Sequence, residues 1–229
     1  MTMAQIIKGD CFRVLDEGIH ADLGRAIIVT DPPFNVGYHY HEYSDALKPD
    51  EYMKMLSSLF DYGIPVVMVN YPETLYRLSA FTGRVPERVV SWVYPSNTGR
   101  QHRDIAFYGI RPDFRKVTQP YKTPNDKRIR KLIEKGSTGS RIYDWWQVNQ
   151  VKNVSREKTG HPCQMPLEVM TNIIGILPDD AVIIDPYAGS GTTLVAAERM
   201  GRESIGIEID ETYVDIITER LKKEDEKDR

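Results

Sequence analysis

An aspartate, two prolines and an aromatic residue stand directly after a short apolar run, in an order that could orient an amine for nucleophilic attack. The tetrapeptide is Asp31, Pro32, Pro33 and Phe34, and the apolar run before it covers residues 26–30. The turn should be stiff, because proline fixes its own φ and restricts the residue before it. If Asp31 and the Pro32 carbonyl accept both hydrogens of an exocyclic amine, its nitrogen can direct a lone pair at a nearby electrophile.

A second cluster could bind a ligand that carries a ribose. Asp185 ends an apolar run, and Gly189 and Gly191 follow it before a helical pattern begins. Glycines permit a tight turn and let a ligand approach the main chain closely, because no side chain blocks it. Glu208 ends the next apolar run, about twenty residues on, where a carboxylate can accept hydrogen bonds from ribose hydroxyls. Leu194 stands at the third glycine position of GxGxxG, which disfavours a nicotinamide-type site.

Alternating apolar and periodic segments predict the elements that position both clusters. Strands are expected at 6–7, 26–30, 66–70, 89–94, 105–108, 181–185 and 204–207, with 89–94 and 105–108 paired. Helices are expected at 12–17, 49–60, 166–177, 192–200 and 212–223. This alternation predicts an α/β fold with a mostly parallel sheet covered on both faces. Both clusters then lie at the carboxyl ends of strands, where such sheets bind ligands.

Four motifs together resemble those of the S-adenosylmethionine-dependent amino-methyltransferases of DNA. Residues 31–35 resemble the DPPYN form of the catalytic motif (D/N/S)PP(Y/F), and residues 185–192 resemble the cofactor motif DxFxGSGT. Residues 161–166 are similar to the HPtqKP element, and residues 9–11 to the GDc element. The catalytic motif precedes the glycine motif, which is the permuted order of the beta group. The resemblance covers nearly the whole chain.

The resemblance implies a Rossmann-like methyltransferase fold, mostly parallel with an antiparallel hairpin, as a single catalytic domain over residues 1–229. The chemistry would fall to Asp31, Pro32, Pro33 and Phe34, with Phe34 stacked on the extruded base. The implied cofactor is S-adenosylmethionine. Its binding residues would be Asp10, Cys11, Asp185, Pro186, Ala188, Gly189, Gly191, Thr192 and Glu208.

The implied reaction is direct attack by the N6 amine of a flipped adenine in DNA. Asp31 favours adenine, because family members that act on cytosine N4 usually begin the catalytic motif with serine. Cytosine N4 stays the alternative, and an inactive DNA-binding relative or an RNA substrate also stays open. Cys163 lies in a Pro-Cys-Gln tripeptide like that of cytosine-C5 methyltransferases, but it precedes the glycine motif and no ENV element accompanies it. We therefore expect Cys163 to be structural.

Charge is distributed unevenly along the chain. The net charge is −3, yet residues 100–135 hold eleven Lys or Arg against four acidic residues. A basic segment on an acidic body is typical of phosphate binding, although a solvated charged loop is the alternative. A small basic DNA-recognition insert is expected at about 111–160. The expected DNA-binding residues are Arg100, Arg103, Arg111, Arg115, Lys116, Lys122, Lys127, Arg128, Arg130 and Lys131.

Three departures from the family pattern bear on function. Phe34 replaces the commoner tyrosine, which keeps stacking and removes a hydroxyl. Met165 replaces the usual lysine, so the positive charge expected near the cofactor's carboxylate is missing or comes from elsewhere. The interval at 111–160 is short for a target-recognition region, and this favours a short or relaxed recognition sequence.

Composition excludes several other classes. No stretch reaches the ~18 to 20 apolar residues of a membrane span, and residues 1–10 lack a secretory pattern, so we expect a cytoplasmic protein. The family resemblance implies a bacterial or phage origin. Two cysteines and five dispersed histidines predict neither a disulfide framework nor a metal site, although His39 and His41 could share one side of a strand. DNA is the expected partner, no membrane is, and the resemblance leaves a homodimer open.

Two aromatic segments are expected to pack rather than to react. Residues 38–43 could cover a flipped base or contact DNA, but a loop that packs on the surface is commoner. Trp145 and Trp146 are expected in the core or at a hinge.

Overall fold

The computed structural model describes residues 3–19, 24–38, 43 and 45–227. Ten strands are assigned there: β1 (Ala4–Lys8), β2 (Arg25–Thr30), β3 (Val66–Asn70), β4 (Arg88–Val93), β5 (His102–Tyr108), β6 (Thr118–Gln119), β7 (Ser140–Arg141), β8 (Trp145–Gln147), β9 (Ala181–Asp185) and β10 (Ser204–Glu208). The helices are α1 (Cys11–Asp16), α2 (Pro49–Ser58), α3 (Pro72–Thr82), α4 (Lys127–Glu134), α5 (Leu167–Gly175), α6 (Thr192–Arg199) and α7 (Glu211–Lys227).

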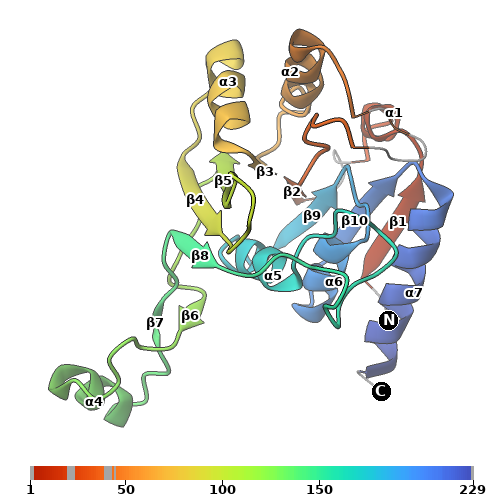
Figure 1. Ribbon diagram of the computed structural model, residues 1–229. Helices are drawn as coiled ribbons and strands as arrows, with labels where there is room; N and C mark the ends of the chain where they lie inside the picture. The colour runs from red at the N-terminus through yellow and green to blue at the C-terminus, as the bar shows by residue number, and fades with distance from the viewer. Residues whose placement is uncertain (1–2, 20–23, 39–42, 44, 228–229) are drawn as a thin grey trace.

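Eight of the strands form one sheet in the order β1-β10-β9-β2-β3-β5-β4-β8 (Figure 1). The five from β1 to β3 run parallel to one another. β5 runs antiparallel to both β3 and β4, and β8 pairs parallel with β4. The predicted α/β fold is confirmed, including its mostly parallel sheet and its antiparallel hairpin.

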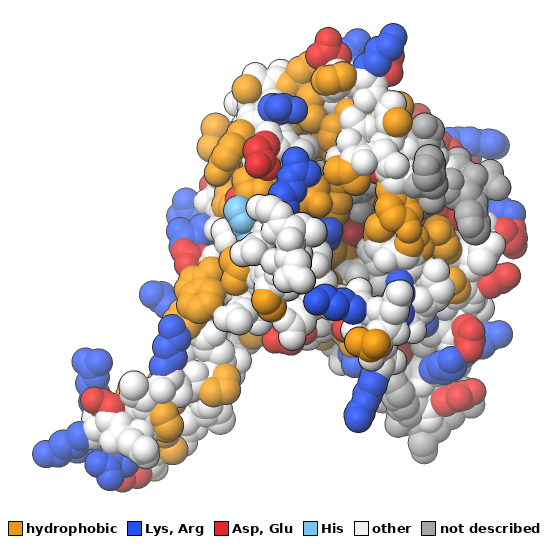
Figure 2. Space-filling view, in the orientation of Figure 1, with side chains coloured by type: hydrophobic (Ala, Val, Ile, Leu, Met, Phe, Trp, Pro, Cys, Tyr) orange, Lys and Arg blue, Asp and Glu red, His pale blue; other side chains and the backbone are white. Residues whose placement is uncertain are grey.

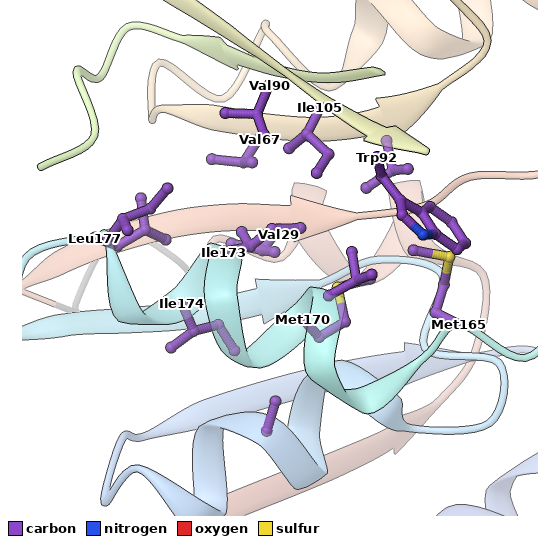
Figure 3. Close-up of a cluster of buried hydrophobic side chains, with 14 of the residues drawn as sticks. Val29, Val67, Val90, Trp92, Ile105, Met165, Met170, Ile173, Ile174 and Leu177 are labelled. Carbon is purple, nitrogen blue, oxygen red and sulfur yellow. The ribbon is translucent and has the colours of Figure 1, made fainter. Parts of the chain in front are cut away.

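Strand β2 lies at the centre of the sheet, and its side chains alternate between two cores. Ile27 and Val29 face a cluster that α5 covers, whereas Ala26 and Ile28 face a cluster that α1, α2 and α3 cover. This alternation follows from the period of two along a strand. Figure 3 shows the first cluster, with Val29 among the strand side chains that meet α5. Helix α6 packs beside α5, and α7 packs beside α6; α6 and α7 enclose a third small cluster against β1.

Two helices were absent from the sequence-based expectation. Helix α3 follows β3, begins at Pro72 and ends at Gly83, whose φ of 69° closes the helix in the left-handed conformation. Proline at the start and glycine just past the end are the usual boundary signals, so this helix was readable in the sequence. Helix α4 begins after Asp126, whose side chain accepts hydrogen bonds from the backbone N–H groups of Arg128 and Ile129.

The segment from β6 to β7 extends away from the rest of the molecule as an arm, which we define as residues 118–141 (Figure 1). Strands β6 and β7 pair only over two residues each, and helix α4 at the end of the arm contains no buried residue. The arm therefore contributes little to the core. Among the described residues, no helix combines the length and apolar character that crossing a membrane requires.

Truncation of a buried side chain in the central strand β2 should test which side chains stabilise this fold. Ile28 is completely buried, so Ile28→Ala should lower the free energy of unfolding by about 2–5 kcal/mol. Val89→Ala, at a position 38% exposed in β4, is the matched control and should change it far less. Urea denaturation followed by circular dichroism measures both variants, and equal decreases would contradict this assignment of the core.

Candidate active site

A pocket of about 170 Å³ lies at the edge of the sheet where the five parallel strands end. The carboxyl ends of β1, β2, β9 and β10 all contribute to its wall. Most of the residues predicted for catalysis or cofactor binding line it: Asp10, Cys11, Asp31, Pro32, Pro33, Phe34, Pro186, Ala188, Gly189, Thr192 and Glu208. Asp185 and Gly191 are not among the lining residues, although Pro186 and Thr192, which directly follow them in the chain, are.

The glycine turn forms one side of the pocket and requires its glycines. Gly189 has a φ of 53° and Gly191 a φ of 73°, which side chains rarely adopt. A Cβ at Gly191 would also lie 2.8 Å from the Ile217 side chain of α7. The turn can thus pack between the pocket and α7 only because these positions carry no side chain.

Glu208 holds the glycine turn through its carboxylate. Its Oε2 accepts a hydrogen bond from the Gly189 N–H at 2.7 Å, and its Oε1 accepts one from the Asp210 N–H at 2.9 Å. Burial raises the pKa of Glu208, and these N–H donors oppose that rise. A carboxylate offers about four acceptor positions, so Glu208 can still accept hydrogen bonds from hydroxyl groups in the pocket.

Asp10 and Cys11 begin α1 at the neighbouring strand end. The Asp10 Oδ1 accepts a hydrogen bond from the Arg13 N–H at 3.0 Å and so caps the helix. The Gly9 N–H donates to the Glu208 carbonyl at 2.9 Å, which fixes this corner to β10. Burial raises the pKa of the Cys11 thiol to about 12, so Cys11 stays protonated and contributes shape rather than a nucleophile.

Asp185 ties the two predicted clusters together from beneath the pocket. Its Oδ1 accepts a hydrogen bond from the Thr30 hydroxyl at 2.8 Å and another from the Tyr187 N–H at 3.1 Å. Thr30 immediately precedes Asp31, so the end of β2 is joined to the start of the glycine turn. Burial raises the pKa of Asp185, in keeping with a structural carboxylate that stays out of solvent.

Asp31 faces the pocket next to this buried carboxylate. Burial, together with the negative charge of Asp185, raises the pKa of Asp31 well above its usual range, while the positive charge of Arg103 lowers it. No described side chain donates a hydrogen bond to the Asp31 carboxylate. Its acceptor positions are therefore available to a ligand in the pocket.

Residues that sequence reasoning missed support the turn after Asp31. The Tyr52 hydroxyl donates to the Pro33 carbonyl at 2.8 Å and accepts a hydrogen bond from Asn70. Asp45, only 2% exposed, accepts from the N–H of Asn35 at 2.7 Å, where the backbone has a φ of 56°. The position of Asn70 at a strand end was a sequence signal for this edge, whereas Asp45 gave none.

The segment at 161–166 contributes another part of the pocket lining. His161, Cys163 and Met165 line it, and Gln164 accepts hydrogen bonds from the Thr159 N–H and hydroxyl at 2.8 and 2.9 Å. The His161 ring packs on the Tyr213 ring at 4.4 Å between centroids. The motif match at these residues thus corresponds to one wall of the site.

The predicted DNA-binding residues fall into three structural groups. Five lie on the arm, where Figure 2 shows Lys and Arg side chains gathered around its tip: Lys122, Lys127, Arg128, Arg130 and Lys131. Arg100 and Arg103 lie against aromatic rings, both contacting Tyr71. The other three contact acidic residues: Arg111 with Glu87, Arg115 with Asp113, and Lys116 with Asp179.

The structure also bears on the two adjacent tryptophans and on the expectation about metal binding. Trp146 is buried as expected, but Trp145 is 43% exposed and stacks on Tyr143, with the Lys122 ammonium 5.1 Å from its ring. His39 and His41 lie outside the described residues. Within the described ranges, no group of three His, Cys, Asp or Glu side chains could hold a metal ion.

Comparisons with known proteins agree on one family. Residues 83–219 match a family model described as DNA methylase. The Type II methyltransferase M.ScaI of Streptomyces caespitosus is 44% identical over 108 residues, which cover 45% of this chain and 35% of that protein. The Type II methyltransferase M.HpaI of Haemophilus parainfluenzae is 24% identical over 224 residues, which cover 86% of this chain and 68% of that protein. The chain thus spans about a third of the first relative and two thirds of the second.

Solved structures share the fold. The M1.HpyAVI–SAM complex superposes with a TM-score of 0.61 and 21% identity, over 95% of this chain and 99% of that one. The cytosine-N4-specific PvuII DNA methyltransferase superposes with a TM-score of 0.64 and 16% identity, over 96% of this chain and 93% of that one.

The pH dependence of stability should report on His161 in the wall of the pocket. Burial, with the nearby Lys158 ammonium, lowers the pKa of His161 to about 4, against a usual value of 6.5. A neutral His161 therefore contributes stability above pH 6.5 that is lost as the pH falls toward 4. Relative to His161→Gln, the wild-type free energy of unfolding should drop by on the order of 3 kcal/mol across that window. Parallel denaturation curves at all pH values would contradict a buried neutral imidazole.

Proposed function

The chain belongs to the N6/N4 DNA methylase family, and on this premise we propose that it transfers a methyl group from S-adenosylmethionine to an exocyclic amine of a base in DNA, adenine N6 being the favoured acceptor. One observation carries the proposal. The Asp31-Pro32-Pro33-Phe34 turn and the glycine turn open onto the same pocket. A group that accepts amine hydrogens thus lies beside a surface suited to a nucleoside cofactor.

The residues that line the pocket fit the proposed cofactor in their chemistry. Glu208 would accept hydrogen bonds from the ribose hydroxyls, and Gly189 exposes backbone with no side chain in the way. Asp10 and Cys11 would lie beside the adenine, at the start of α1. When bound, the cofactor supplies an electrophilic methyl group on a sulfonium, whose sulfur takes the electron pair of the broken bond.

The chain's own residues would activate the amine by orientation. An exocyclic amine is a weak nucleophile, because its lone pair is delocalised into the ring. The Asp31 carboxylate and the Pro32 carbonyl would accept its two hydrogens, which frees the lone pair to form the new nitrogen–carbon bond. The surplus proton then leaves to Asp31 or to water. Phe34 would stack on the flipped base, and Tyr52 holds the turn through the Pro33 carbonyl.

Adenine N6 and cytosine N4 share this chemistry, so the choice rests on Asp31. The aspartate favours adenine, because relatives that act on cytosine N4 usually carry serine at this position. Cytosine N4 remains the second candidate, because the chain shares its fold with a cytosine-N4-specific enzyme. The naming of M.ScaI and M.HpaI as Type II methyltransferases supports a role in restriction–modification.

The arm is proposed to hold the DNA backbone. Its exposed Lys and Arg side chains have few acidic partners among the described residues, and they gather around the tip of the arm, away from the rest of the molecule (Figure 2). Affinity for DNA comes largely from neutralised phosphates, which requires such a surface. The proposed recognition insert at 111–160 contains the whole arm.

Product analysis tests the reaction. Purified protein is incubated with unmethylated DNA and methyl-labelled cofactor, and the digested nucleosides are identified by mass spectrometry. We expect labelled N6-methyladenine, and its disappearance in Asp31→Ala, because the amine is then no longer oriented. Cys163→Ser is the matched control in the same pocket and should keep most of the activity.

Each other product has a defined meaning. Labelled N4-methylcytosine would move the proposal to the second candidate. Labelled C5-methylcytosine, absent in Cys163→Ser, would replace it with thiolate chemistry. No product from DNA or RNA, with the cofactor bound, would support an inactive binding relative.

Salt dependence tests the arm. The double variant Arg128→Gln/Arg130→Gln should weaken DNA binding and reduce the slope of log K against log salt by about one for each phosphate that the arm no longer neutralises. Arg25→Gln removes an exposed charge at the amino end of β2, opposite the pocket, and serves as the control. Fluorescence anisotropy over a salt series measures both. An unchanged slope in the double variant would show that the arm does not hold phosphates.

A further inference from the structure

Arg103 lies in a cage of aromatic rings beside the catalytic turn. It is in β5, directly opposite Trp92 of β4 in the strand register. Its guanidinium carbon lies 4.4 Å from the ring centroid of Phe34, 5.2 Å from that of Trp92 and 5.7 Å from that of Tyr71. With Tyr94 at 6.0 Å, these four rings form what we call the aromatic cage. Such contacts stabilise a cation through the electrostatic field of the ring faces.

The cage is rigid on the side of the core. Trp92 is 1% exposed, and its indole N–H donates to the Val148 carbonyl at 2.7 Å. The Arg103 Nη1 lies 3.6 Å from the sulfur of Met165, which lines the pocket. Figure 3 shows the Trp92 and Met165 side chains next to each other. The cation therefore reaches the corner of the pocket at which the family resemblance leads one to expect a lysine.

Among the described residues, no carboxylate forms an ion pair with Arg103. Asp104 follows it along β5, but successive side chains point to opposite faces of the sheet, and Asp104 accepts a hydrogen bond from Ser91. The Arg103 Nε is buried and has no hydrogen-bond partner among the described residues. A half-buried guanidinium held by rings instead of acids keeps its field available to the pocket.

Asp31 is the pocket acid on which that field acts. Burial and the charge of Asp185 from β9 both raise the pKa of Asp31, and Arg103 from β5 lowers it. Two other titratable pocket groups, Cys11 and Tyr43, have pKa values raised to about 12 and stay uncharged. No Lys or Arg is among the described residues that line the pocket. Arg103, behind Phe34, is thus the cation that counters the cluster of acids.

We propose that Arg103 is a positioning residue of the methyl-transfer site: its caged guanidinium favours the charged form of the Asp31 carboxylate and supports the Phe34 ring, and it holds no DNA phosphate. This inference rests on the proposed function, because Asp31 must be a carboxylate to accept the amine hydrogens. It also separates Arg103 from the exposed arginines and lysines of the same basic segment.

The matched control for this proposal is Arg100. Its guanidinium lies 4.2 Å from the same Tyr71 ring, but it is exposed and does not shift the pKa of Asp31. Arg100→Gln removes the same charge from the same neighbourhood as Arg103→Gln does. Arg103→Lys keeps the charge while it removes the planar guanidinium, so it separates electrostatics from stacking.

The first test is the pH profile of methyl transfer. In Arg103→Gln, the acidic limb of kcat/KM should move up by about one to three pH units, because the opposite charge near Asp31 is gone. Arg103→Lys should restore most of that shift, and Arg100→Gln should leave the limb in place. The salt dependence of DNA binding should be the same in Arg103→Gln as in the wild type. A limb that stays in place together with weaker, less salt-dependent binding would overturn the proposal in favour of a phosphate contact.

The second test needs no catalysis. The Asp31 carboxyl carbon is followed by ¹³C NMR in protein labelled at aspartate and assigned by the signal that disappears in Asp31→Asn. Arg103→Gln should raise the midpoint of its titration, while Arg100→Gln should not. A raised midpoint without any methylated product would retain the Asp31–Arg103 coupling and reject the methyltransferase function. An unchanged midpoint in a variant whose melting temperature equals that of the wild type would reject the coupling itself.

Discussion

The buried hydrogen bond between Thr30 and Asp185 is the contact on which the site depends. A carboxylate removed from water is costly unless hydrogen bonds satisfy it, and here the Thr30 hydroxyl and the Tyr187 N–H do so. The bond joins the end of β2 to the end of β9 at the centre of the parallel sheet. Helices leave these two strands toward opposite faces, so a crevice opens there and both motifs face it.

The same arrangement crowds acidic groups, and this sets the electrostatics of the site. Asp31, Asp185 and Glu208 lie at three strand ends, and burial raises the pKa of each. Glu208 is stabilised by backbone N–H groups and Asp185 by Thr30, whereas no described side chain donates to Asp31. Asp31, the acid proposed to accept the amine hydrogens, is therefore the least stabilised of the three, and the field of Arg103 bears on it most directly.

The buried core and the exposed basic arm lie in different parts of the molecule. The two large hydrophobic clusters lie on either face of the sheet and involve helices α1, α2, α3, α5 and α6. The arm adds no buried residue from α4 and presents its charged side chains to solvent. Surface charges contribute little to folding, so the sequence of this segment can vary while the core keeps the pocket intact.

The sequence by itself determined the two turns that meet at the pocket, because the requirements of each motif are local. A turn with φ above zero needs Gly189 and Gly191, and an acid directly after an apolar run marks a strand end, as at Asp31. Only the tertiary structure decided which distant groups act on them. Arg103 was counted with the basic segment, yet strand pairing places it beside Phe34, and Asp45 had no signal for its role in the turn. Such contacts depend on strand register and on the face of the sheet to which a residue points, and the residues adjacent in sequence do not determine either one.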